Sequence, residues 1–344
     1  MKPKVLSILP RLRFEDSKVS FPTELAFSFE DVREEEEVIE ACRGVDFLLL
    51  PAAFPQITAR ILENIPSVRM IQSAGTGYDK VDVESAARER IPVANSPGQN
   101  ITTVAELAVG MIIALQRNLL SADREIKAGN YGIVRERLFR TGLKEISDIR
   151  LGIVGLGAIG RKVAQIAGLL GAKVSYYDPY RPDPEVEKEF DVVFTPFDEL
   201  LRTSDVISLH LPLSDHTRDL IGPQELKRMP AGALLINPAR GEIVDQEALA
   251  ESLEAGHLAG AAIDTVSPEP PPAFHPLLNL SAEARDRILI TPHIAGTTRG
   301  AFRRMLTNAL ANIVSVVAGK APRNVVNGVK QARLPEIPSG NPGR

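Results

Sequence analysis

The 344-residue sequence contains no tryptophan, a single cysteine and only five histidines. A lone cysteine, Cys42, excludes an internal disulfide and a thiolate metal cluster, and we expect it to have a structural or incidental role. The 44 acidic and 40 basic side chains give a net charge of −4, which argues against nucleic acid as the main partner. The longest strongly apolar stretch, 107–115, is shorter than the ~20 residues that span a bilayer. These absences favour a cytoplasmic globular protein without a metal, and the length favours two domains.

Short apolar runs alternate with amphipathic segments along the chain, which is typical of parallel sheets with helices on their faces. In the first hundred residues we expect strands at 4–9, 46–50, 69–74 and 92–95 and helices at 31–42, 57–65 and 83–90. A buried apolar helix follows from Asn100, and Thr103 and Glu106 near its start fit a capping box. Residues 128–149 break the pattern. A second series then has strands at 151–155, 173–177, 205–210, 233–237, 260–264 and 287–291, and a last helix at 298–318.

The strongest motif is the glycine pattern of residues 155–160, Gly-Leu-Gly-Ala-Ile-Gly. It follows an apolar strand and opens a helix, which is the context of a dinucleotide-binding turn. Gly155 is expected to make the tight turn, Gly157 to let the backbone approach a pyrophosphate, and Gly160 to let helix and strand pack closely. The free N–H groups at the helix start suit the phosphates. The motif therefore predicts binding of a dinucleotide cofactor.

Asp178 ends the next expected strand, 18 positions beyond Gly160 and close to the ~20 expected for a ribose contact. Its carboxylate can accept from both ribose hydroxyls and would repel a 2′-phosphate, which favours NAD over NADP. Arg181 nearby is a cation that would suit NADP. A simple turn-forming role for Asp178 before Pro179 is the alternative interpretation.

A hydride-transfer enzyme needs a proton carrier, and histidine suits that task near neutral pH. Of the candidates, His293 follows an apolar strand at the edge where such folds place their sites, and the others are His210, His216, His257 and His275. Arg240 follows a buried strand, and the next strand is followed by Asp264 and Glu269. Because strand carboxyl ends converge on one crevice, Arg240, one of these acids and His293 are expected to meet. A satisfied core histidine and an arginine paired with a structural carboxylate are the alternatives.

Five segments together make the chain resemble the D-isomer-specific 2-hydroxyacid dehydrogenases over about residues 3–327. They are the glycine motif with Asp178, and segments 208–213, 237–245, 264–270 and 291–296. The resemblance implies an α/β fold of two doubly wound parallel-sheet domains. A Rossmann NAD-binding domain (100–296) would be inserted into a flavodoxin-like substrate domain (1–99 and 297–330), followed by a loosely ordered tail (331–344). The family also implies a homodimer.

The resemblance further implies roles for individual residues. Arg240 would hold the substrate carboxylate and carbonyl, His293 would be the acid/base, and Glu269 would hydrogen-bond it. The loop formed by Ala74, Gly75, Thr76 and Gly77 would offer backbone N–H groups to the substrate carboxylate. Asp264 would lie beside the nicotinamide. The remaining cofactor contacts implied by the family are Ala158, Ile159, His210, Pro212, Pro238 and Ala239, besides Arg240.

Some positions depart from the family pattern. Thr265 and Val266 stand where Val-Phe is common, which changes the wall beside Glu269. Ser73 stands where phosphoglycerate dehydrogenases tend to have arginine, and Thr76 stands where phosphite-oxidising relatives use lysine. We therefore expect an NAD-dependent reductase of a small 2-keto acid such as glyoxylate or hydroxypyruvate. Two alternatives stay open: oxidation of 3-phosphoglycerate, with Arg135, Arg137 and Arg140 as cations, and an NADH-sensing corepressor-like module.

Overall fold

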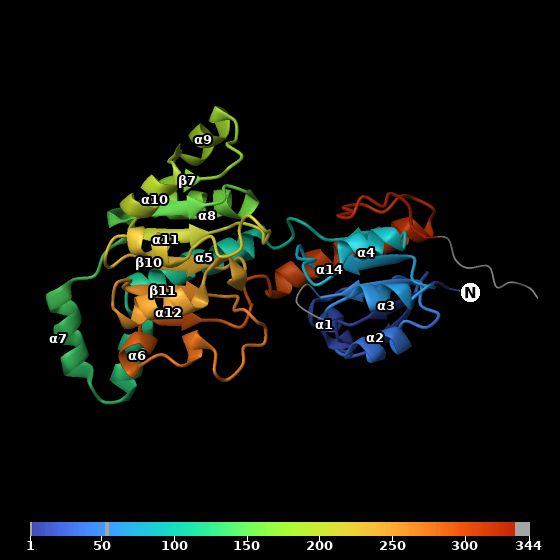
Figure 1. Cartoon of the computed structure of the whole chain (residues 1–344), viewed down its shortest axis with the longest axis horizontal. Coiled ribbons are helices and arrows are strands. Elements are labelled where there is room, and N and C mark those ends of the chain that lie inside the picture. Colours follow the sequence, from blue (N-terminus) through green and yellow to red (C-terminus); the bar gives the residue numbers. More distant parts are fainter. Residues whose placement is uncertain (1, 52–54, 334–344) are drawn as a thin grey trace, which may run out of the picture. The chain divides into compact units, whose positions relative to one another are not determined.

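The computed structural model describes residues 2–51 and 55–333 (Figure 1). The chain divides into two compact units, one formed by Met1–Asn100 with Thr297–Arg344 and the other by Ile101–Gly296. Each contains one parallel sheet with helices on both faces. This confirms the predicted fold class of two doubly wound parallel-sheet domains.

The first unit has a five-stranded sheet in the order β2-β1-β3-β4-β5. Its strands are β1 (Lys4–Ser7), β2 (Ala26–Phe29), β3 (Phe47–Leu50), β4 (Met70–Ser73) and β5 (Val93–Ala94), and its helices are α1 (Arg11–Asp16), α2 (Glu35–Ala41), α3 (Ala59–Glu63), α4 (Val83–Arg88) and α14 (Arg299–Val317). Leu306, Leu310 and Ile313 of α14 pack on one face of the sheet. Cys42 lies in the core on the other face, and burial raises the pKa of its thiol to about 12, which agrees with a structural role.

The second unit has a seven-stranded sheet in the order β12-β11-β10-β9-β6-β7-β8. The strands are β6 (Arg150–Val154), β7 (Lys173–Tyr177), β8 (Val192–Phe194), β9 (Val206–Leu209), β10 (Leu234–Asn237), β11 (Gly260–Ile263) and β12 (Ile288–Ile290). The helices are α5 (Ile101–Gln116), α6 (Leu119–Lys127), α7 (Tyr131–Thr141), α8 (Ala158–Leu169), α9 (Pro184–Phe190), α10 (Phe197–Thr203), α11 (Pro223–Arg228), α12 (Gln246–Glu254) and α13 (Ala282–Arg285), with 3-10 turns η1 (Ile146–Asp148), η2 (Gly241–Ile243) and η3 (Pro276–Leu278). Apolar side chains of α5 and α8 cover one face, and those of α10, α11 and α12 cover the other.

Helix α5 begins two residues earlier than its expected cap. Thr103 is a buried residue inside the first turn, so the predicted capping box is wrong. Among the described residues no single helix is long and apolar enough to cross a membrane, whereas α5 and α6, bent by 58°, meet the length and composition test as a pair. Ala108, Val109 and Ile112 of α5 lie in the core of the unit, which accounts for its apolar composition.

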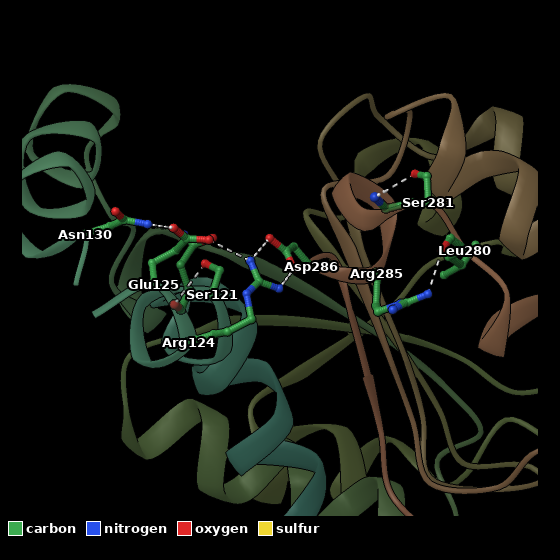
Figure 2. Close-up of polar contacts among 10 residues, drawn as sticks. Ser121, Arg124, Glu125, Asn130, Leu280, Ser281, Arg285 and Asp286 are labelled. Carbon is green, nitrogen blue, oxygen red and sulfur yellow. Dashed lines mark hydrogen bonds and ion pairs between the residues drawn. The ribbon is translucent and has the colours of Figure 1, made fainter. Parts of the chain in front are cut away.

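The segment expected to break the pattern instead contains the helix α7, and Figure 1 shows it standing away from the sheet of its unit. Its base is fixed by polar contacts of α6 (Figure 2). Arg124 pairs with Asp286, which precedes β12, and also with Glu125 at 3.0 Å. Glu125 in turn accepts from the Asn130 side chain at 2.8 Å, at the start of α7. The glycines and arginines of this region therefore belong to a helical arm, α7 with the turns beside it, whose base is anchored by these contacts.

The end of the described chain returns to the first unit. Arg333, which the sequence placed in the loosely ordered tail, donates to the carbonyls of Glu89 and Pro66, and its own carbonyl accepts from Arg69. The rest of the predicted tail, 334–344, lies outside the described residues.

Candidate active site

The glycine motif forms the turn between β6 and α8, next to β9, where the strand order of the sheet reverses. Gly155 has φ +96°, and a Cβ there would lie 2.7 Å from the His210 carbonyl oxygen. A Cβ on Gly160 would lie 2.1 Å from the Gly155 carbonyl oxygen, so only glycine lets α8 pack this closely. Gly157, by contrast, has open space where its Cβ would stand. The turn is tight on its protein side and open at Gly157.

The start of α8 has the properties of a phosphate site. Gly157 is the N-cap residue of this 12-residue helix. Within the described chain no group accepts from the backbone N–H groups of Gly157, Ala158 and Ile159. Free N–H groups with the positive end of the helix dipole bind phosphate. The turn therefore fits the pyrophosphate of a dinucleotide.

Asp178 follows β7 and faces this turn. One carboxylate oxygen accepts from the Leu156 N–H at 2.8 Å, and the other accepts from the Tyr180 N–H at 2.9 Å. The second contact is the turn-forming role considered above, and the first fixes the glycine turn to the end of β7. Each carboxylate oxygen keeps a further acceptor position for a ribose hydroxyl.

Arg181, the cation that suited NADP, is engaged elsewhere. Its guanidinium donates to both carboxylate oxygens of Glu187, at 2.8 and 3.1 Å, and stacks on Phe194 with its Cζ 4.9 Å from the ring centroid. Glu187 also accepts from the Tyr176 hydroxyl at 2.6 Å. Arg181 is thus held by a bidentate partner that is itself anchored in the fold.

His210 follows β9, and its carbonyl adjoins Gly155. Burial lowers the pKa of its imidazole to about 3, which favours the neutral ring. Its Nε2 lies 2.8 Å from the Ser208 hydroxyl. Pro212, two residues on, accepts at its carbonyl from the Thr217 hydroxyl at 2.7 Å. Both residues lie at the strand edge that carries the glycine turn.

Arg240 lies three residues beyond β10, after Pro238 and Ala239. Its carbonyl accepts from the Asn237 side chain at 2.7 Å, and its guanidinium donates to the Ala239 carbonyl at 2.7 Å. Its side chain is half-buried. The next residue, Gly241, is one that the sequence reasoning did not single out: a Cβ there would lie 2.5 Å from the Val266 carbonyl carbon. The glycine directly after Arg240 is the feature of the sequence that could have indicated this close approach of two backbone segments.

His293 is paired with Glu269. The imidazole Nδ1 lies 2.9 Å from Glu269 Oε2, with side-chain exposures of 32% and 23%. No group in the described chain bonds to Nε2, so this nitrogen is the one that can face a ligand. Because a carboxylate is an acceptor, it favours the Nδ1–H tautomer and stabilises the protonated ring. The pair has the composition of a proton donor and acceptor.

Asp264 fixes the backbone that carries His293. It is 1% exposed, and its carboxylate accepts from the Thr291 hydroxyl at 2.5 Å, the Ile294 N–H at 2.9 Å and the Ala295 N–H at 2.8 Å. Its carbonyl accepts from the His293 N–H at 2.7 Å. His293 itself has φ +53°, in the left-handed region, which costs about 1–3 kcal/mol. Such strain is found where the surrounding structure imposes it, and here Asp264 does so.

Strand pairing brings these groups to one edge. In the sheet Asn237 pairs with Ile263, and Ile263 pairs with Ile290, so β10, β11 and β12 end side by side. The Asp264 N–H donates to the Asn237 carbonyl at 3.0 Å, which ties the first two ends together. Arg240, Asp264 with Glu269, and His293 follow these three ends in turn.

The remaining three histidines lack the features of His293. His216 is exposed, and Nε2 of His257 lies 3.1 and 3.0 Å from the carbonyls of Leu226 and Met229. His275 is 3% exposed and its Nε2 lies 3.0 Å from the Ser267 carbonyl. Of the five histidines, only His293 has a carboxylate partner and an available ring nitrogen.

The loop 74–77 belongs to the other unit and follows β4. Its carbonyls at positions 75, 76 and 77 accept from the Ser96 N–H at 2.8 Å, the Asn95 side chain at 2.8 Å and the Ser73 hydroxyl at 2.7 Å. Among the described residues, nothing accepts from the backbone N–H groups at these three positions. Ser73 and Asn95 were not predicted as site residues. Together with the Ser96 N–H they occupy the carbonyls of the loop, which leaves its N–H groups available for an anion.

The second unit thus joins a dinucleotide-type turn to a histidine–carboxylate pair and an arginine at the carboxyl edge of one parallel sheet. In open α/β sheets this edge is where ligands bind. The class that this combination defines is a nicotinamide-dependent oxidoreductase.

Comparison with known proteins gives the family. The model of the D-isomer specific 2-hydroxyacid dehydrogenase, NAD binding domain, matches residues 109–295. Glyoxylate reductase of Korarchaeum cryptofilum (strain OPF8) is 35% identical over 84% of this chain and 85% of its own length. D-3-phosphoglycerate dehydrogenase of Methanocaldococcus jannaschii is 33% identical over 90% of this chain, which spans 56% of that protein. The structure of D-lactate dehydrogenase from Aquifex aeolicus complexed with NAD and lactic acid has a TM-score of 0.78, 26% identity, and coverage of 92% of this chain and 96% of that one.

The chain therefore belongs to the D-isomer specific 2-hydroxyacid dehydrogenases and is an NAD-dependent oxidoreductase. The resemblance predicted from its motifs is confirmed.

Proposed function

We propose that the protein reduces a small 2-keto acid of the glyoxylate or hydroxypyruvate type to the corresponding 2-hydroxy acid, in the D form where the product is chiral. The observation that carries this proposal is the His293–Glu269 pair, which follows strands adjacent to the one that leads to Arg240. The glyoxylate reductases among its relatives support a small substrate. NADH, when bound at the glycine turn, supplies the hydride.

His293 is the proposed acid/base. Its Nε2 would give a proton to the ketone oxygen in reduction and take the hydroxyl proton in oxidation. Glu269, 2.9 Å from Nδ1, stabilises the ring while it is protonated. Arg240 would hold the carboxylate and polarise the carbonyl, because a guanidinium presents several fixed donors to planar oxygen groups. The proposed task of loop 74–77 is to donate backbone N–H groups to a substrate carboxylate.

For the cofactor we propose NADH over NADPH. Asp178 adds a negative charge where a 2′-phosphate would lie, and Arg181, the nearby cation, is neutralised by Glu187. We propose further contacts with the cofactor from Pro238, Ala239, His210 and Pro212, which lie along the same strand edge. For Asp264, whose carboxylate accepts from Thr291, Ile294 and Ala295, we propose support of the turn that carries His293.

Oxidation of 3-phosphoglycerate is the second candidate, supported by the phosphoglycerate dehydrogenases among the relatives. Against it, the Ser73 hydroxyl is used to hold the Gly77 carbonyl, so this position offers no cation for a phosphate. Of the arginines considered for that role, Arg140 pairs with Glu136 and Arg135 stacks on Phe139.

We also propose that the protein is a homodimer associated through α7. Tyr131, Ile133 and Phe139 of this helix are 61%, 70% and 73% exposed, and the Arg124–Asp286 contact holds the base of the arm. Burying such apolar surface is the main driving force of association. Phe139→Asp should shift the protein toward monomer in sedimentation analysis, and an unchanged sedimentation coefficient would contradict this interface. A cytoplasmic location stays a prediction, which cell fractionation would test.

The test of function is a panel of 2-keto acids and 3-phosphoglycerate, assayed with NADH and NADPH in both directions. We expect turnover of a small 2-keto acid with NADH, and its loss in His293→Ala. Activity only with 3-phosphoglycerate would favour the second candidate. NADH-dependent self-association without turnover of any substrate would favour the corepressor-like sensor.

A further inference from the structure

We propose that His275 and Gln246 are positioning residues for Glu269. Neither side chain is assigned a contact with substrate or cofactor. Both hold the backbone of Ser267, two residues before Glu269, and through it they set the place of the carboxylate beside His293. This inference rests on the proposed role of the His293–Glu269 pair.

The backbone of Ser267 is bonded to two side chains. Its N–H donates to Gln246 Oε1 at 3.2 Å, and its carbonyl accepts from Gln246 Nε2 at 3.1 Å. The same carbonyl lies 3.0 Å from Nε2 of His275. The side-chain amide of Gln246 thus bonds to both the N–H and the carbonyl of Ser267, as the backbone of a neighbouring strand would. Ser267 is therefore fixed although it lies in a loop.

His275 is suited to be a fixed donor. It is 3% exposed, and its Nδ1 accepts from the Leu277 N–H at 3.3 Å. Since Nδ1 accepts a hydrogen bond, Nε2 carries the N–H that points to the Ser267 carbonyl. The His275 carbonyl accepts from the Asn279 side chain at 3.0 Å, which ties down the loop that carries the imidazole.

The same segment is confined from the other side. Gly241 places its backbone so close to residues 266 and 267 that a Cβ would lie 2.7 Å from the Ser267 nitrogen. Between Ser267 and Glu269 stands Pro268, and Pro270 follows, so φ is restricted on both sides of the glutamate. Fewer backbone torsions are therefore free to absorb a shift of Ser267 before it reaches Glu269.

The pair that depends on this placement is partly open to solvent. With exposures of 23% and 32%, Glu269 and His293 are not held together by burial alone. A misplacement of about 1 Å in catalytic geometry can lower the rate roughly a hundredfold. Support from the surrounding hydrogen bonds is what keeps such a site in its productive geometry.

The test compares two substitutions of similar size at one position. His275→Gln keeps an amide N–H in place of Nε2–H, whereas His275→Met removes the donor. We expect kcat/KM for the 2-keto acid to fall roughly tenfold in H275M and to stay within about threefold of the parent enzyme in H275Q. His257→Met is the matched control, because this ring also donates to backbone carbonyls of the same unit but touches nothing near Glu269. It should retain the parent kcat/KM even if it lowers the melting temperature.

A second readout separates positioning from stability. In H275M the loss should fall on kcat while the KM for NADH stays near the parent value, because a displaced carboxylate affects proton transfer and not cofactor binding. In a Glu269→Gln background, adding H275M should change kcat/KM less than about twofold, since residues acting through one group are not additive. If H275M does not fold, Gln246→Leu, at a half-exposed position, is tested in the same cycle.

The outcomes decide between the two levels of the proposal. The positioning role is overturned, and the proposed function stands, if E269Q loses activity while H275M and Q246L behave like the parent enzyme. The same holds if the fold-changes in kcat/KM of H275M or Q246L multiply with that of E269Q in the double variant. If E269Q itself retains parent activity, the role of the His293–Glu269 pair fails and the inference fails with it.

Discussion

The most informative single substitution is Asp264→Asn, because it separates two roles for one buried carboxylate. The resemblance to the family assigns Asp264 to the nicotinamide side of the cofactor. In the structure both of its oxygens are in use: they accept from the Thr291 hydroxyl and from the two backbone N–H groups that follow His293. Asparagine keeps the size of the side chain and one of these oxygens. It replaces the other oxygen by an NH2 group.

The magnitude follows from the contacts. If the remaining oxygen keeps the Thr291 and Ile294 donors, the new NH2 group faces the Ala295 N–H, so one hydrogen bond to a charged group is lost at a site 1% exposed. Such a bond contributes about 1.5–3 kcal/mol, and two facing donors add to the loss. We therefore expect Asp264→Asn to lower the free energy of unfolding by about 2–3 kcal/mol. This is comparable with the strain of about 1–3 kcal/mol at the left-handed His293, so the turn should relax.

The assay combines urea unfolding with steady-state kinetics. A relaxed turn displaces the imidazole, so kcat should fall roughly tenfold or more while the KM for NADH changes little. Thr291→Val is the control, because it removes one donor to the carboxylate and leaves both backbone contacts. An Asp264→Asn protein with parent stability and a raised KM for NADH would refute this reasoning and place the carboxylate on the cofactor instead.

Three further predictions concern other parts of the second unit. Glu187→Gln removes the charged partner of Arg181. The kcat/KM for NADPH divided by that for NADH should then rise roughly fivefold. An unchanged ratio would show that Arg181 does not reach a 2′-phosphate. The Thr265 hydroxyl is buried without a partner in the described chain, so Thr265→Val should raise the free energy of unfolding by about 1 kcal/mol in urea titrations, and a loss would reveal an unseen partner. Although burial opposes it, hydrogen bonds from Arg150 lower the pKa of Asp205 to about 2. This carboxylate therefore stabilises the fold above pH 4 by about 2 kcal/mol, and the contribution is lost as the pH falls toward 2. Asp205→Asn should be less stable by that amount at pH 7, and its free energy of unfolding should fall less between pH 5 and pH 3.

The fold was predictable where apolar runs are long and bounded. Strands such as β6, β9 and β10 are continuous buried runs, and their ends agree with the expected ones within two residues. The strand β2 was missed because its residues alternate between half-buried and exposed at a sheet edge. β8, at the edge of the other sheet, has only three residues.

The helix α7 was missed for a different reason. The segment contains Gly132 and three arginines and was interpreted as a break in the alternation of strands and helices. Glycine disfavours helix, and the segment has no apolar stripe to bury. Only Val134 is buried among its described residues. A helix that stands away from the core lacks the periodic signal on which the prediction depends.

At the site, the residue types and strand ends were predictable, but the pairing was not. Spacing alone left Asp264 and Glu269 as equal partners for His293. The choice depends on the turn after β12, where the His293 N–H binds the Asp264 carbonyl and the side chain turns to Glu269. Likewise, nothing in the sequence around His275 shows that its ring meets Ser267. Contacts between loops depend on three-dimensional closure, which a local pattern does not contain.

The close approach at Gly241 has a consequence for how this enzyme can be altered. The backbone directly after the proposed substrate-binding arginine rests on the segment that leads to the glutamate, with no side chain between them. An engineer who widens the pocket by moving Arg240 also moves the carboxylate behind the acid/base. Affinity and turnover should therefore change together in variants of this turn, and substrate range should be altered more safely from the loops on other strands.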